Sequence, residues 1–128
     1  MAFRNLALLR GTHPEGSVLR VSVRRRIVAF SPARQHMERL GWKNRDRIVA
    51  LVDDETGLCR LFRHESGWAL RNAGGNAASG NQSVHVPKRI GDDVFFVGVP
   101  ETLPPTPIRD VRMVSDPEFG DGLEFALP

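Results

Sequence analysis

The sequence predicts a mainly β protein with one short helix, folded as a small barrel or sandwich. Short apolar runs rich in Val, Ile and Phe recur along the chain, and turns containing Gly, Asp, Asn or Pro separate them. Apolar residues recur at helical spacing in one segment, residues 32–40. The 128 residues are enough for one hydrophobic core and too few for two independent ones.

We expect a short amphipathic helix over residues 32–40. Ser31 can cap a helix, and Pro32 is tolerated in its first turn. Gly41 is typical of the position just after a helix. The apolar face of this helix consists of Ala33, Met37 and Leu40.

Strands are predicted where apolar and polar residues alternate or where a short apolar run lies between turns. The first two predicted strands either form one long bent strand or separate at Arg24–Arg26. The acidic turn at residues 53–57 joins the strands on either side of it into a hairpin. The four prolines between Pro100 and Pro107 predict a stiff extended connector. The predicted strands are residues 18–23, 27–30, 47–52, 58–62, 68–71, 83–86, 93–99 and 108–114.

Basic residues are concentrated in the first third of the chain, although the net charge is only +3. Residues 1–47 carry eleven basic and three acidic side chains, a net charge of +8; residues 48–100 carry five and six, and residues 101–128 two and six. Sixteen of the 18 basic residues are Arg, which binds phosphate in bidentate fashion and stacks on bases. A GC-rich genome also raises the Arg content, but it does not explain this segregation.

The cluster Arg24–Arg26 is the centre of a predicted nucleic-acid-binding surface. Neutralising phosphates with such side chains releases counterions and favours binding. The alternative interpretation is a charged edge that discourages strand pairing between molecules. The predicted nucleic-acid-binding residues are Arg20, Arg24, Arg25, Arg26, Arg34, Lys43, Arg45 and Arg47.

Residues 27–62 contain a specific order of elements. A strand leads through Ser31-Pro32 into a short helix that ends in Leu40-Gly41, and Asp46-Arg47-Ile48 starts the next strand. This order resembles that of the swapped-hairpin AbrB/MazE-type DNA-binding family, although Arg45 stands where that family usually has Gly.

The resemblance implies an intertwined homodimer that presents basic side chains to DNA. It favours double-stranded over single-stranded DNA. The positions that match are Arg24, Arg25, Arg26 and Arg34. We therefore expect a small DNA-binding regulator of transcription, of bacterial or phage type.

The sequence does not predict an enzyme, a cofactor or a metal site. Cys59 lies in an apolar predicted strand, where a buried inert thiol is expected. Four histidines lack metal-ligand spacing to each other and to this cysteine: His13, His36, His64 and His85.

Trp42 and Trp68 can each stack on bases of a single strand or pack against the protein. We expect packing in the core or at its edge for both. Trp42 follows the glycine that ends the helix, and Trp68 begins a predicted strand.

Residues 115–128 are interpreted as an acidic tail that follows a single β-rich domain at residues 1–114. The tail combines acidic side chains with several apolar ones, so we expect it to dock on its own chain or on a neighbouring subunit. A second hypothesis for the function depends on this tail. In that reading, the protein is an adaptor or inhibitor that acts through the Pro-rich arm and the acidic tail.

The expected location is the cytoplasm, and the expected assembly is a homo-oligomer. The single cysteine excludes an intrachain disulfide and fits a reducing compartment. No apolar run approaches the roughly 18 residues of a membrane-spanning helix, so no membrane association is expected.

Overall fold

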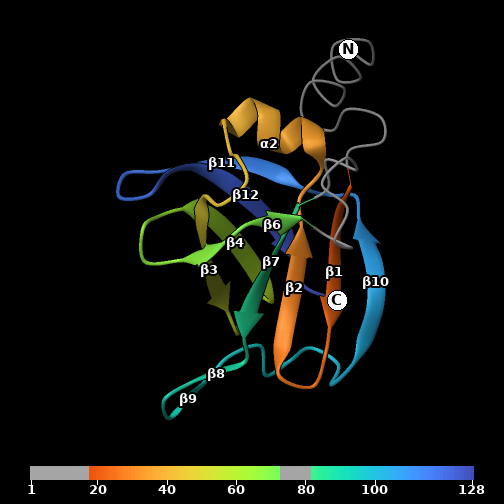
Figure 1. The fold of residues 1–128 in the computed structure, drawn as a ribbon. Coiled ribbons are helices and arrows are strands. Elements are labelled where there is room, and N and C mark those ends of the chain that lie inside the picture. Colours follow the sequence, from red (N-terminus) through yellow and green to blue (C-terminus); the bar gives the residue numbers. More distant parts are fainter. Residues whose placement is uncertain (1–17, 73–81) are drawn as a thin grey trace.

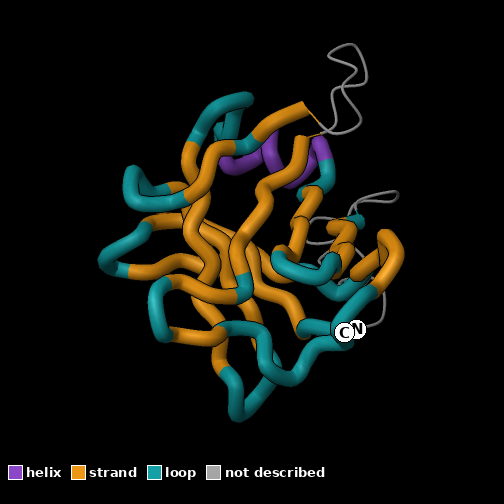
Figure 2. The backbone as a smooth tube through the Cα atoms, turned by 60° about the horizontal axis from the view of Figure 1, so that its bottom comes forward, coloured by secondary structure: helices purple, strands orange, loops and turns teal. Residues whose placement is uncertain are grey.

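The computed structural model describes residues 18–72 and 82–128, which form two five-stranded sheets, a small hairpin and one short helix. The helix lies at one end of the strands (Figure 1), and strands joined by loops make up the rest of the described chain (Figure 2). The predicted mainly β fold with one short helix is confirmed; the described residues form no closed barrel, and their sheets are compatible with a sandwich. No helix in these two ranges is long and apolar enough to cross a membrane.

The first sheet is antiparallel and contains residues 19–31 of the basic first third of the chain. Arg24 donates its backbone N–H to the carbonyl of Ile27 at 2.9 Å, which closes a turn and separates the first two strands. In spatial order, its strands are β10 (Leu103–Ile108), β1 (Leu19–Val23), β2 (Ile27–Ser31), β7 (Gln82–Pro87) and β6 (Arg71–Asn72).

The second sheet is built around the predicted hairpin at residues 47–62, which is confirmed. In spatial order, its strands are β11 (Arg112–Asp116), β12 (Gly120–Ala126), β4 (Leu58–Arg63), β3 (Arg47–Asp53) and β5 (Trp68–Ala69). A separate hairpin consists of β8 (Arg89–Ile90) and β9 (Asp93–Val94).

The chain passes from one sheet to the other at Leu70. Residues 68–71 were expected to be one strand, but β5 pairs with β3 of the second sheet and β6 pairs with β7 of the first. Leu70 between them is fully buried. Its N–H donates to the Asp46 carbonyl at 2.8 Å, and its carbonyl accepts from the Arg45 N–H at 2.9 Å. These two bonds hold Leu70 against the loop between the helix and β3.

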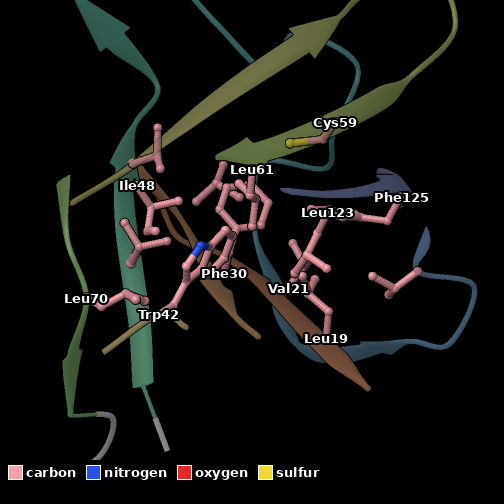
Figure 3. Packing of buried hydrophobic residues seen from close by; sticks show 14 of the residues in the cluster. Leu19, Val21, Phe30, Trp42, Ile48, Cys59, Leu61, Leu70, Leu123 and Phe125 are labelled. Carbon is pink, nitrogen blue, oxygen red and sulfur yellow. The ribbon is translucent and has the colours of Figure 1, made fainter. Parts of the chain in front are cut away.

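The core lies between the sheets and is rich in aromatic and branched side chains (Figure 3). The Phe30 ring of the first sheet meets that of Phe125 of the second edge-on, with 5.7 Å between the ring centroids. Phe30 also lies 5.9 Å from the ring of Phe96. Because alternate residues of a strand point to opposite faces, the core positions Leu19 and Val21 leave Arg20 on the outer face.

The helix α2 (Arg34–Leu40) begins two residues later than predicted, and its N-cap is Ala33, without a side-chain cap. The expected capping by Ser31 is therefore wrong. The helix ends as expected at Gly41, which has a φ of 72° and donates its N–H to the Glu38 carbonyl. Met37 is buried, so the predicted apolar face packs against the sheets.

Two predictions for the segment after β7 are wrong. Residues 93–99 were expected to be a strong strand, but pairing stops after β9. Phe96 has a φ of 61°, which breaks an extended strand, and its ring turns into the core while Val97 is 70% exposed. The Pro-rich segment is not a connector, because its residues 103–108 form β10. Prolines fit there because β10 is an edge strand.

The acidic segment is part of the second sheet. The expected boundary after residue 114 falls inside β11, and β12 lies between β11 and β4. The expectation that this segment docks on its own chain is confirmed, and it docks by strand pairing with β4. Leu123 and Phe125 are buried in the core, and the Glu124 carboxylate accepts a hydrogen bond from Arg60 Nε at 2.7 Å.

Candidate nucleic-acid interface

Three adjoining grooves, with volumes of about 550, 360 and 440 Å³, hollow the outer face of the first sheet. Ser22 of β1 and Pro105 of β10 line all three, so the grooves form one continuous trough, which we call the sheet groove. The largest of them is lined by Ser22, Arg24, Ala29, Ser31, Trp68, Ala69, Arg71, Asn72, Ser83, His85 and Pro105.

The floor of the sheet groove is recessed because its side chains are small. Ser22 lies opposite Ala29 in the register of β1 and β2, and Ala29 lies opposite His85 of β7. Ser31 lies opposite Arg20, and Ser83 lies opposite Arg71. The floor therefore consists of hydroxyl and methyl groups, and long cationic side chains stand on either side of it.

The lining of the sheet groove is cationic. Within the described ranges, no Asp or Glu lines any of the three grooves. Among the ion pairs of the described residues, none involves Arg24 or Arg71, whereas Arg34 pairs with Glu38 at 3.3 Å on the exposed face of α2. The arginines that line the groove are Arg20, Arg24, Arg25, Arg34 and Arg71.

The imidazole of His85 responds to this positive field. Partial burial lowers the pKa of His85 below its usual value, and the nearby charges of Arg24 and Arg71 lower it further. Both effects favour the neutral form of this side chain. An anion bound in the groove would oppose the effect of the two arginines on the pKa of His85.

Trp68 brings an aromatic surface to the same groove. Its side chain is partly buried and packs against the core, as expected, but it also lines the largest groove beside Arg71 and Asn72. The side-chain Oδ1 of Asn72 accepts a hydrogen bond from the side-chain Nε2 of Gln82 at 2.6 Å, which holds the Asn72 side chain in place. Trp42, in contrast, is buried in the core, as expected.

No family model, no curated protein and no solved structure matches this chain. The resemblance to the swapped-hairpin family stays a prediction, and the function has to be argued from the site itself.

The structure divides the predicted binding residues into two groups. All eight are exposed. Four of them line the sheet groove: Arg20, Arg24, Arg25 and Arg34. Arg26 belongs to the same turn as Arg24, and its carbonyl accepts the N–H of Lys88 at 3.0 Å.

The other three predicted residues lie near the second sheet. Lys43 and Arg45 are in the loop between α2 and β3, and Arg47 begins β3. Arg45 has a φ of 78° and uses its backbone N–H to hold Leu70. The Arg47 guanidinium lies 3.5 Å from the Gly67 carbonyl.

Sequence reasoning did not assign Arg71 or His85 to the site. Arg71 ends a predicted strand, but its position beside Ser83 depends on the pairing of β6 with β7. The amino-acid sequence between β6 and β7 does not indicate the register in which these strands pair. Outward-pointing residues of paired strands share one face of the sheet. Such residues can be identified only after the pairing of the strands is known.

Cys59 and His64, two further reactive side chains of the described residues, lie outside the sheet groove. Cys59 is fully buried, and burial raises the pKa of its thiol strongly. His64 Nδ1 shares a 2.6 Å hydrogen bond with the Ser66 hydroxyl, and its ring meets that of Phe119 edge-on. Residues 18–72 and 82–128 contain no group of three or more His, Cys, Asp or Glu side chains placed to hold a metal ion. His13 lies outside the described residues.

Proposed function

We propose that the protein binds nucleic acid, with DNA favoured, through the sheet groove. The observation that carries the proposal is the groove lining, which combines five arginines with no carboxylate among the described residues. An acid-free basic groove is the electrostatic arrangement that attracts a phosphate backbone.

The spacing of the arginines suits several phosphates at once. β1 and β6 are separated by two strands, so Arg20 and Arg71 are about 14 Å apart at a strand spacing of about 4.8 Å. Ser31 and Ser83 lie between them and offer hydroxyl donors. Both guanidinium groups can therefore contact separate phosphates of one backbone, with hydroxyl contacts between them.

The wider role rests on the sequence alone. A small transcription regulator, a homo-oligomer, a cytoplasmic location and the absence of enzymatic activity stay predictions. The adaptor hypothesis also stays a prediction. The Pro-rich arm is strand β10, and the acidic tail supplies strand β12, so neither is a free segment.

The test is the salt dependence of binding, measured by fluorescence anisotropy with labelled oligonucleotides. Replacing Arg24 and Arg71 with Ala should weaken binding and reduce the slope of log affinity against log salt by up to about 1.8 on a duplex or about 1.4 on a single strand, since each lost phosphate contact removes about 0.9 or about 0.7. The matched control is the pair Arg89→Ala and Arg112→Ala, which removes the same charge from exposed positions outside the groove.

The control variant should bind nearly as the unchanged protein does, because neither of these side chains lines the groove. Equal slopes and affinities for the groove variant and the control variant would contradict the proposal. If the unchanged protein does not bind at low salt, the proposed function is contradicted as well.

A further inference from the structure

We infer that the nucleic acid in the sheet groove is a single strand, and that one of its bases stacks on Trp68. The inference rests on the proposed function and names the form of nucleic acid that this groove accepts. It differs from the double-stranded target that the sequence resemblance implies.

The first argument is the position of the aromatic side chain. Of the described residues that line the three grooves, Trp68 is the one with an indole or phenyl ring. It lies in the largest groove together with Arg71 and Arg24. A basic groove with an aromatic side chain is the arrangement that binds single strands, because the cations follow the backbone while the ring stacks on an exposed base.

The second argument is the shape of the surface. Base edges of a duplex are read by an α-helix or a β-ribbon that enters its major groove. The sheet groove has the opposite shape, since its floor of Ser22, Ala29 and Ser83 is recessed between longer side chains. The helix α2 has seven residues and buries Met37 in the core. A recessed floor accepts a base that is already unstacked, and it cannot reach bases inside a duplex.

The third argument is the set of polar groups around Trp68. The Asn72 amide, the His85 imidazole and the Ser83 hydroxyl line the same groove. These groups can exchange hydrogen bonds with the edge of an unstacked base. The sheet groove runs along β1, whose five residues span about 17 Å. It is therefore long enough for a few nucleotides rather than a single one.

The test compares single-stranded and double-stranded DNA of the same sequence, about 12 nucleotides long, a length within the range of single-strand sites. The full-length protein is titrated with each probe, and anisotropy gives the affinity. A Trp42→Phe variant leaves Trp68 as the only tryptophan, so its emission reports the groove directly. The single strand should bind more tightly than the duplex and should quench the emission of Trp68.

Two substitutions at Trp68 separate stacking from packing. Trp68→Leu keeps an apolar side chain against the core but removes the ring, and it should weaken single-strand binding roughly 5- to 150-fold, or about 1–3 kcal/mol. Trp68→Phe keeps a smaller ring and should recover a large part of the affinity. Circular dichroism melting curves of both variants show whether each is folded.

The outcomes distinguish this inference from the proposed function. Equal or tighter duplex binding without quenching overturns the inference. The groove function then still stands if the Arg24→Ala/Arg71→Ala variant loses that binding. Equal single-strand affinity of folded Trp68→Leu protein also overturns it. Failure of both probes to bind at low salt overturns the function and the inference together.

Discussion

Replacing Phe125 with Ala tests whether the acidic C-terminal segment is part of the core. The Phe125 side chain is 2% exposed, and its ring meets that of Phe30 across the two sheets. Truncating a buried Phe removes its transfer free energy and leaves a cavity, at a cost of about 3–5 kcal/mol. This is a large part of the roughly 5–15 kcal/mol that stabilises a typical domain.

We expect the melting temperature of the Phe125→Ala protein to fall by roughly 10–20 °C in a chain of this size. Circular dichroism and urea titration give the melting temperature and the free energy of unfolding. Phe119→Ala is the matched control, because this ring belongs to the same segment but stacks on Phe62 in a half-exposed position, with 5.3 Å between the ring centroids. A Phe125→Ala protein as stable as the Phe119→Ala protein would show that β12 does not belong to the core.

Two more predictions concern a strand contact and a titrating side chain. Gly122→Ala should destabilise the protein severely, because a Cβ there would lie 2.3 Å from the backbone oxygen of Leu61, whereas Gly98→Ala meets open space and should leave the melting temperature nearly unchanged. Because the pKa of His85 is lowered on folding, its protonation opposes folding, so stability should decline as the pH falls below about 6.5. His85→Gln should remove part of that decline, and melting curves recorded across this pH range would contradict the reasoning if both proteins behaved alike.

Local signals predicted the helix and one hairpin, although the local hairpins β8–β9 and β11–β12 were missed. The helix was found because Met37 and Leu40 follow at helical spacing and Gly41 ends it. The hairpin β3–β4 was found because an acidic Gly-containing turn joins two apolar runs. Such features depend on neighbouring residues and on their backbone preferences, and both can be inferred from the amino-acid sequence.

Elements that depend on distant pairing were not predicted. Nothing near Gly120–Ala126 indicates that this strand lies between β4 and β11, because its pairing with β4 joins residues about half the chain apart. Leu103–Ile108 was expected to be a connector since its prolines disfavour strands, but an edge position tolerates them. The lining of the sheet groove was predicted only in part for the same reason. Arg24 was predicted from the basic cluster, whereas the position of Arg71 depends on the register of β6 and β7.

The prolines of β10 have a consequence for the ligand that enters the sheet groove. Pro105 borders the whole trough, and the rings of Pro104, Pro105 and Pro107 restrict the backbone φ angles along this side. Little conformational entropy remains to be lost there when a ligand binds, so this side of the site is preorganised. The same prolines lack N–H donors, so the edge gives a passing strand from another molecule few hydrogen bonds and resists fibril-like association. The groove can thus lie beside an open sheet edge without recruiting other polypeptides to it.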